Sequence, residues 1–473
     1  MATSVHLLTL GCARNDVDSE ELAARLSAGG FEFVAEPADA ELLVVNTCGF
    51  IEQAKKDSID TLLAANDLKE SGKAKAVVAV GCMAERYGAE LQAALPEADG
   101  VLGFDSYPDI ADRLKRILDG EHFDAHTPSD RRKLLPIAPV ERSAHDPSLS
   151  VPGHAQDFLP AGVGPASGPV TVRRRLGSGP YAPLKIASGC DRRCAFCAIP
   201  AFRGSYLSRP AVDIVSEANW LVSQGVKEVM LVSENTSSYG KDTADKMALV
   251  DLLQQLNAVD GLEWIRVSYL QPAEIRPGLL ETMAELDHVV PYFDLSMQHA
   301  SKSVLRRMRR FGDPDSFLAL LDRIRQLAPE AGIRSNFIVG FPGESEQEFA
   351  ELCQFVAAAR LDVAGVFGYS DEEGTEGATL PGHLDEDAIA ERVAELSQIV
   401  DAAVDARAAE RVGDPVKVLV ESIEDEELVG RAAHQGPEVD GICYLLNADA
   451  QVGDFVDAVV IDSQGADLFA QAD

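Results

Sequence analysis

The cysteines are the residues of this chain whose type and spacing could carry chemistry. Three of them, Cys190, Cys194 and Cys197, lie in the run SGCDRRCAFCAIP with the spacing C-x3-C-x2-C. Three thiolates on one loop can each bind one iron of a [4Fe–4S] cube and leave the fourth iron open to another ligand. A structural zinc site is the alternative, but it needs a fourth Cys or His at short spacing, and the nearby loop has no histidine.

An open iron of this kind can chelate the amino and carboxylate groups of S-adenosylmethionine (SAM). Electron transfer from the cluster then cleaves the sulfonium to a 5′-deoxyadenosyl radical, which is chemistry of the cofactor itself. The spacing, with Phe196 before the last cysteine, resembles the signature of the radical-SAM superfamily. The sequence therefore predicts that Cys190, Cys194 and Cys197 bind a [4Fe–4S] cluster and, through it, SAM.

A second set, Cys12, Cys48 and Cys82, is too widely spaced for a local metal knuckle. Each follows a predicted parallel strand by one or two residues, in LTLGC, VNTC and VAVGC. The carboxyl ends of such strands share one edge of a doubly wound sheet, so the three thiols should converge there. Three buried structural cysteines are the alternative, because free cysteine is often buried. We expect a second [4Fe–4S] cluster with an open iron, and glycines at 11 and 81 that let the backbone pass close to it.

The two remaining cysteines have no such context. Cys353 lies on the apolar face of a predicted helix, and Cys443 lies in a predicted strand near the C-terminus. Both are expected to be core residues without a metal role.

Size and charge limit the classes of function. A chain of 473 residues should contain two to four domains. Its formal net charge of −35 disfavours nucleic acid as the main partner and favours a basic protein. The N-terminus does not resemble a signal peptide, and no stretch has the apolar length of a membrane helix. The protein is therefore expected in the cytoplasm, where grouped cysteines indicate metal or redox chemistry.

The elements that must position the cysteines alternate along the chain. Residues 1–120 show short Val- and Leu-rich runs at 5–10, 41–46 and 76–80, each followed by helical periodicity, which predicts a doubly wound parallel sheet. Residues 121–182 are rich in Pro, Gly and Ser without a period, and are interpreted as a linker or insertion.

Residues 183–410 contain a second β/α series, closed by a long helix near 385–410. Its six candidate strands predict a partial (β/α)6 barrel that binds ligand at the strands' carboxyl ends, and lie at 183–188, 227–233, 262–269, 292–297, 333–340 and 363–370. Residues 411–473 switch to short β runs separated by turns, which predicts a small antiparallel β-barrel.

Together these residues resemble the methylthiotransferase family, and the resemblance covers nearly the whole chain. It implies an N-terminal domain with an auxiliary cluster, a radical-SAM core and a C-terminal TRAM domain. One branch of the family modifies the β-carbon of an aspartate in ribosomal protein uS12, whereas the MiaB-type branch modifies a prenylated adenosine in tRNA. The segment 121–182 is longer than the connection usual in the family, and no role is assigned to it.

Three features favour the uS12 branch. The loop GCDRRCAFCAIPAFRG is similar to that branch, and so are MQHASKSVLRRMRR, FIVGFPGE and VFGYSDEEGT. The third feature is physical: residues 411–473 hold fourteen acidic residues against three basic ones, Arg411, Lys417 and Arg431. A tRNA-binding domain should be basic, whereas an acidic one attracts a basic ribosomal protein.

The resemblance implies that two SAM molecules serve two purposes. One methylates a sulfur held at the Cys12/Cys48/Cys82 cluster, and the other is cleaved at the Cys190/Cys194/Cys197 cluster, whose radical takes hydrogen from the aspartate β-carbon. An electron donor is implied as a partner, and no membrane. No catalytic side chain is assigned. A tRNA methylthiotransferase remains an alternative function, as does a non-catalytic iron–sulfur or zinc scaffold that docks on the ribosome.

Four further residues are weaker candidates. Glu234, at the end of the strand LVSEN, is placed for a SAM contact or for a capping or core role. Arg192, Arg193 and Arg203 could orient a substrate carboxylate, but a solvated loop is the default expectation for them. The run GFPGE at 340–344 could approach SAM or form a strand-to-helix turn with glycines at positive φ.

Overall fold

The computed structural model of the protein describes residues 3–128, 130, 149–151, 163–165, 173–425 and 427–472. No helix in this described part of the chain is long and apolar enough to cross a membrane. The chain divides into two compact units, each described by itself below. The first comprises Met1–Ser178, Lys185–Arg192 and Ala198–Ile214, and the second comprises Gly179–Leu184, Arg193–Cys197 and Val215–Asp473.

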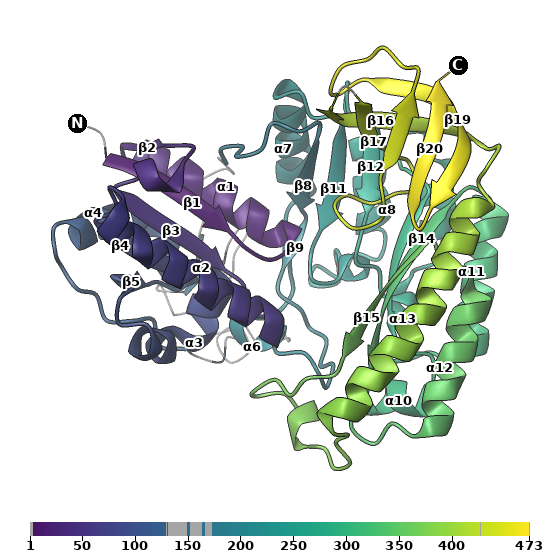
Figure 1. Ribbon diagram of the computed structural model, residues 1–473, viewed down its shortest axis with the longest axis horizontal. Coiled ribbons are helices and arrows are strands. Elements are labelled where there is room, and N and C mark those ends of the chain that lie inside the picture. The colour runs from purple at the N-terminus through teal and green to yellow at the C-terminus, as the bar shows by residue number, and fades with distance from the viewer. Residues whose placement is uncertain are drawn as a thin grey trace. The chain divides into compact units, whose positions relative to one another are not determined.

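The first unit is built on a five-stranded parallel sheet with the order β2-β1-β3-β4-β5 (Figure 1). The predicted βαβαβα pattern is confirmed. Strands β2 and β5 were not predicted, because three and two residues are too short to show a period. The elements are β1 (Thr3–Thr9), α1 (Ala13–Ala28), β2 (Phe31–Phe33), β3 (Leu42–Thr47), α2 (Glu52–Ser71), β4 (Ala76–Val80), α3 (Gly81–Ala94), β5 (Gly100–Val101) and α4 (Ile110–Leu118).

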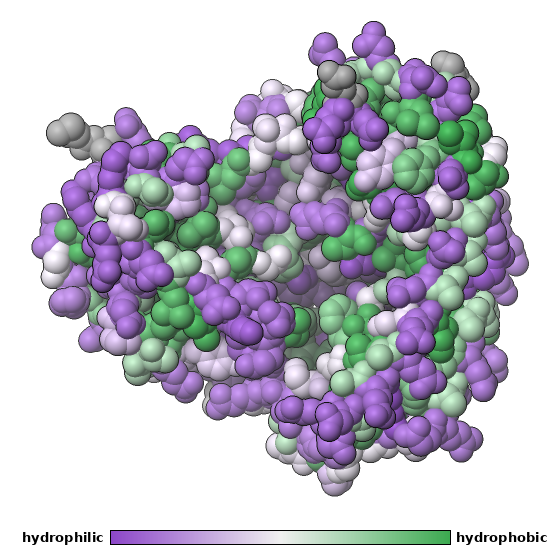
Figure 2. All heavy atoms as spheres, viewed as in Figure 1, coloured by the Kyte–Doolittle hydropathy of each residue, from purple (hydrophilic) through white to green (hydrophobic). Residues whose placement is uncertain are grey.

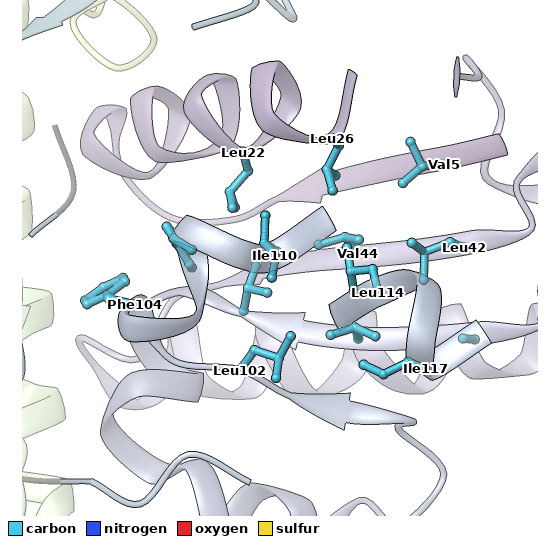
Figure 3. Close-up of a cluster of buried hydrophobic side chains, with 14 of the residues drawn as sticks. Val5, Leu22, Leu26, Leu42, Val44, Leu102, Phe104, Ile110, Leu114 and Ile117 are labelled. Carbon is cyan, nitrogen blue, oxygen red and sulfur yellow. The ribbon is translucent and has the colours of Figure 1, made fainter. Parts of the chain in front are cut away.

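Alternating side chains of the central strands supply both faces of this sheet. In β3, Leu42 and Val44 pack into the core beneath α1 and α4, whereas Leu43 and Val45 pack beneath α2 and α3. Figure 3 shows the first core, with Leu22 and the α4 side chains directed toward the strands. The outer side of α2 is mainly hydrophilic (Figure 2). Burial on both faces explains the near-continuous apolar runs of β3 and β4.

The second unit contains all six strands predicted for the partial barrel. They form two three-stranded sheets, β12-β11-β8 and β13-β14-β15, which are joined by isolated parallel bridges such as that between Leu270 and Leu295. The strands are β8 (Tyr181–Lys185), β11 (Glu228–Val232), β12 (Trp264–Val267), β13 (Tyr292–Gln298), β14 (Gly332–Val339) and β15 (Val363–Gly368).

Helices separate these strands, as the periodicity predicted. They are α7 (Ala211–Ser223), α8 (Ala248–Asn257), α9 (Leu279–Glu285), α10 (Lys302–Arg307), α11 (Pro314–Leu327), α12 (Glu346–Ala359) and α13 (Glu386–Ala409). The long closing helix, α13, lies against β15 and α12 and also contacts the C-terminal strands (Figure 1). Three short elements lie near the 190–197 loop: β9 (Ala187–Ser188), α6 (Ile199–Arg203) and β10 (Leu207–Ser208).

Much of the predicted linker, at 129, 131–148, 152–162 and 166–172, lies outside the described residues. Its described parts at 121–128 and 173–180 are irregular. They also include a parallel pair of three-residue strands, β6 (Leu149–Val151) and β7 (Val163–Pro165), which the composition did not indicate.

The C-terminal residues form a closed five-stranded barrel with the order β16-β17-β18-β20-β19. The predicted barrel is confirmed, although one of its pairings, β18 with β20, is parallel. Strands β17 and β20 were not predicted, because charged, small and apolar residues are mixed in their sequences ELVGRA and DLFAQA. The strands are β16 (Pro415–Glu424), β17 (Glu427–Ala432), β18 (Cys443–Leu446), β19 (Phe455–Gln464) and β20 (Asp467–Ala472).

Candidate metal centres

The three N-terminal cysteines lie at the carboxyl ends of neighbouring strands, as the topology predicted. Cys48 directly follows β3, and Cys82 follows β4 by two residues, in the first turn of α3. Cys12 precedes α1 and follows β1 by three residues rather than by one or two, because the strand already ends at Thr9. Strands β1, β3 and β4 are adjacent in the sheet, so the three cysteines share one edge.

Two glycines make this convergence possible. Gly11 has φ +103°, and a Cβ there would lie 3.0 Å from the Sγ of Cys48. Gly81 has φ +89°, and a Cβ there would lie 2.1 Å from the side-chain oxygen of Asn46. Both positions need a left-handed backbone and a hydrogen in place of a side chain. The glycines thus let the backbone pass close to Cys48 and Asn46; the expectation that they make room for a cluster stays a prediction.

Arg203 also reaches this edge, contrary to the expectation of a solvated loop. It is only 7% exposed, at the end of α6. Its Nη2 lies 3.1 Å from the Sγ of Cys82, 3.1 Å from Oδ1 of Asn15 and 3.0 Å from Oδ2 of Asp18. Sequence spacing could not reveal these contacts, because Arg203 and Cys82 are joined only by the fold.

Asn15, which sequence analysis did not single out, fixes the geometry between these groups. Its Nδ2 donates to the carbonyl of Leu10 at 2.8 Å and to that of Thr47 at 3.3 Å. The amide oxygen must therefore face Arg203, and it also lies 3.4 Å from the Sγ of Cys82. Asn15 is 1% exposed, so one buried amide connects the loops that carry Cys12 and Cys48.

The pKa values of the three thiols are shifted in different directions. Burial raises the pKa of the Cys82 thiol to about 12, which Arg203 opposes and the neighbouring Cys12 and Cys48 reinforce. Burial likewise raises the pKa of Cys48. At Cys12 burial acts in the same direction, but Arg14 and Arg203 outweigh it and hold its pKa below the ordinary value. The thiols thus interact electrostatically with one another, and all three interact with the guanidinium of Arg203.

These residues fit an iron–sulfur cluster. Three thiols converge, and Gly11 places no side chain between them. The guanidinium of Arg203 lies beside Cys82, where it would balance the negative charge of thiolates. In the described part of the chain, no three His, Cys, Asp or Glu side chains are placed to hold a single metal ion. A four-iron cube differs from such an ion because it binds each thiolate on a separate iron.

The second cysteine set lies in the loop after β9. Gly189 has φ +78°, and a Cβ there would clash with the carbonyl of Ser205 at 2.2 Å. The N–H of Cys190 donates to the carbonyl of Gly204 at 3.0 Å, and its Sγ accepts from the N–H of Arg192 at 3.4 Å. The first cysteine is therefore fixed by the backbone that follows α6.

Cys194 and Cys197 are held by the second unit. The N–H of Cys197 donates to the carbonyl of Cys194 at 3.1 Å, which makes a tight turn. Between them, Ala195 donates to the carbonyl of Met308 at 3.0 Å and accepts from Gly377 at 2.6 Å. The loop portion that carries these two cysteines is thus anchored to the segments after α10 and after β15.

The weaker candidates occupy different environments. Glu234 is half-buried two residues after β11, Arg192 is half-buried and Arg193 is exposed. Gly340 and Gly343 have φ +76° and +77°, which confirms the predicted turn, and its backbone donates to Glu344. The structure does not assign any of these residues to a ligand.

The cysteines outside the two sets are placed as follows. Cys443 is fully buried in the core of the terminal barrel, as predicted. Cys353 is half-buried on α12, and burial raises its pKa to about 11.

Two of the three cations in residues 411–473 are buried in ion pairs. Arg431 is 1% exposed and binds Glu228 of β11 at 2.7 Å, and Arg411 is 4% exposed and binds Asp362. Lys417 is exposed, with its Nζ 4.7 Å from the ring centre of Phe455. Arg431 also binds Glu421 of the barrel, so Lys417 is the exposed cation among these three.

Comparisons with known proteins agree with this architecture. Family models match residues 4–103 (uncharacterized protein family UPF0004), 184–356 (Radical SAM superfamily) and 412–472 (TRAM domain). The ribosomal protein uS12 methylthiotransferase RimO of Cutibacterium acnes is 64% identical to this chain, covering 99% of the chain and 98% of the relative. The chain belongs to the RimO family of ribosomal protein uS12 methylthiotransferases.

Other members of the RimO family support the same assignment. Those of a Nocardioides species and of Kineococcus radiotolerans are 62% and 61% identical, each covering 99% of this chain and 97% of the relative. The predicted methylthiotransferase resemblance is confirmed, and neither the tRNA branch nor a non-catalytic scaffold is favoured.

Among solved structures, the radical SAM methyltransferase TsrM from Kitasatospora setae has a similar fold. The structure with tryptophan and a SAM analogue bound gives a TM-score of 0.53 at 13% identity, covering 77% of this chain and 73% of that one. The structure with cobalamin and a [4Fe–4S] cluster bound gives 0.51 at 14% identity, covering 78% and 75%. At these identities the likeness concerns the fold alone.

Proposed function

We propose that this protein is a radical-SAM enzyme that adds a methylthio group to the β-carbon of an aspartate in ribosomal protein uS12. When bound, two [4Fe–4S] clusters and SAM would supply radical generation and a methylated sulfur. A radical is needed because no side chain near neutral pH can deprotonate an unactivated sp³ C–H. We also propose a cytoplasmic location and an electron donor as a further partner.

The six strand-end and loop cysteines carry the proposal at the residue level. Cys12, Cys48 and Cys82 would bind the auxiliary cluster, and Cys190, Cys194 and Cys197 would bind the cluster that holds SAM. We propose a corresponding division of the chain: auxiliary-cluster domain 1–120, linker 121–182, radical-SAM core 183–410 and TRAM domain 411–473.

The observation that carries this function is the convergence of three thiols from separate strand ends beside one buried guanidinium. Such an arrangement has little value as core packing, because it buries the Arg203 guanidinium against the Cys82 thiol. It is explained if the thiols are ligands. The same chain provides a second three-cysteine loop with the radical-SAM spacing.

Mass spectrometry of a deletion strain tests the function directly. The methylthio mass should disappear from ribosomal protein uS12, while the methylthiolated nucleosides of tRNA remain at their normal level. Loss of the modification from tRNA, with uS12 unchanged, would assign the protein to the tRNA branch.

The acidic terminal barrel supports a basic protein as the partner. Glu424 and Glu427 are exposed and stand opposite each other in the β16–β17 hairpin. Asp425 between them has φ +49°, which aspartate tolerates. Glu426 also belongs to this acidic run, but it lies outside the described residues.

Charge reversal tests the partner. The change Glu424→Lys with Glu427→Lys should slow association with uS12 several-fold at low salt, because surface charge acts mainly on the rate of encounter. The effect should shrink at physiological salt, where screening acts over about 8 Å.

The matched control is Asp60→Lys with Asp67→Lys, which makes the same charge change on the exposed side of α2. Stopped-flow association rates would compare the two variants. Equal rates for both, at all salt concentrations, would remove the electrostatic argument for a basic partner.

A further inference from the structure

Arg203 belongs to a buried network of charged side chains at the strand-end edge. Its Nη2 lies 3.0 Å from one carboxylate oxygen of Asp18, and Lys185 binds the other oxygen. Asp18 and Lys185 are at most 1% exposed. Two cations therefore share one anion, and these three side chains together carry a net positive charge away from water.

A net buried charge is costly unless a counter-charge lies beside it. Glu85, a buried carboxylate of the same region, binds the backbone N–H of Phe104 at 2.7 Å and lies 3.4 Å from His126. The sulfur of Cys82, in contrast, lies 3.1 Å from the guanidinium. A neutral thiol does not balance this charge, whereas the thiolate of a bound cluster would.

We propose that Arg203 is a positioning residue for the auxiliary cluster: it holds Cys82 through an N–H···S hydrogen bond and balances the negative charge of the cluster's thiolates. The inference rests on the proposed function, because it requires a cluster at Cys12, Cys48 and Cys82. Hydrogen bonds and positive charge at the sulfurs favour the reduced form of a cluster and raise its reduction potential.

The guanidinium of Arg203 has two separate features. Its Nη2 has two N–H groups and lies within 3.1 Å of acceptors on Asn15, Asp18 and Cys82, and its centre lies 5.2 Å from the ring centre of Phe104. A lysine ammonium would keep the positive charge but not the flat guanidinium that lies near this ring. The charge and the hydrogen-bond geometry can therefore be tested separately.

The experiment uses the full-length chain with Cys190, Cys194 and Cys197 replaced by Ala, so that the iron signal comes from the auxiliary site. Electron paramagnetic resonance during a redox titration gives the reduction potential of the cluster. Arg203→Gln should lower the ratio of reduced to oxidised cluster about tenfold at a given potential, which is a fall of about 59 mV for a one-electron couple. Arg203→Lys should recover part of this loss but change the spectrum.

Arg116→Gln is the matched control. Arg116 also pairs with a carboxylate, Glu121, and lies 4.7 Å from the ring centre of Phe123, but the pair is exposed on the surface. The control should keep the potential of the parent. If Arg203→Gln gives the same potential, spectrum and iron content as Arg116→Gln, Arg203 has no role at the cluster.

Two further readouts keep the outcomes distinct. If Arg203→Gln does not fold, the test uses Arg203→Lys instead. A reduction potential and a spectrum of Arg203→Lys that are identical to those of the parent would overturn the hydrogen-bond role of Arg203. If the parent itself binds no iron at the auxiliary site after anaerobic reconstitution, the proposed function fails, whatever Arg203 does.

Discussion

Cys190, Cys194 and Cys197 lie within one stretch of eight residues, whereas Cys12, Cys48 and Cys82 come from three strands spread over some seventy residues. The first set is defined by spacing, and its loop needs only a few backbone hydrogen bonds to keep its shape. The second set exists only when β1, β3 and β4 are paired in register. Binding of iron should therefore be coupled much more strongly to folding at the second set than at the first.

The largest expected effect is on iron content and SAM cleavage. Anaerobically reconstituted protein should hold about eight irons per chain, because two four-iron clusters are expected. Replacing Cys190, Cys194 and Cys197 with Ala should leave about four and abolish formation of 5′-deoxyadenosine. Iron analysis and chromatography of the SAM products check this. Zinc in place of iron in fresh anaerobic preparations would contradict the two-cluster proposal.

The next effect separates the two sets by role. With Cys12, Cys48 and Cys82 replaced by Ala, the chain should still form 5′-deoxyadenosine but should transfer no methylthio group to uS12. The reason is that radical generation is proposed to need only the cluster of the loop cysteines Cys190, Cys194 and Cys197, whereas the proposed sulfur carrier is the cluster of the strand-end cysteines. Mass spectrometry of uS12 measures the transfer. Methylthiolated product from this variant would show that the sulfur comes from elsewhere.

A smaller effect tests the dependence of the strand-end set on the sheet. Gly30 and Gly81 have similar φ values, +87° and +89°, but a Cβ at Gly30 meets nothing within 4 Å. Gly30→Ala should cost about 1–2 kcal/mol of stability from backbone strain alone. Gly81→Ala should cost roughly 3 kcal/mol or more, because its Cβ would also meet Asn46 and the backbone of Thr47.

Urea unfolding and iron analysis measure both consequences. Gly81→Ala should lose the irons of the auxiliary site and keep those of the loop site, whereas Gly30→Ala should keep both. Equal iron content in the two variants would mean that the strand-end set does not depend on close backbone approach.

Most of this architecture could be predicted from the sequence, because buried parallel strands give long apolar runs and each lies next to a clear helical period. The convergence of Cys12, Cys48 and Cys82 was also predictable, since equivalent strand ends meet in any doubly wound sheet. The burial of Arg203 beside Cys82 was not, because nothing in the run AFRG distinguishes a buried guanidinium from a solvated one. Asn15 was missed for the same reason: its partners are backbone carbonyls of other loops.

The ion pairs of Arg411 and Arg431 bear on how the terminal barrel can be exchanged. Their partners Asp362, which is half-buried, and Glu228, which is buried, lie outside the barrel, and Arg431 also binds Glu421 within it. A chimera that receives a barrel without the two arginines would remove one cation from each carboxylate, leaving Glu228 with Arg266 and Asp362 with Arg407. The cost should therefore stay below the about 3–5 kcal/mol of breaking a buried pair that has no other partner. The barrel therefore cannot simply be replaced by another. To engineer a new docking specificity, the charged residues of its outer face should be changed and its inner salt bridges kept.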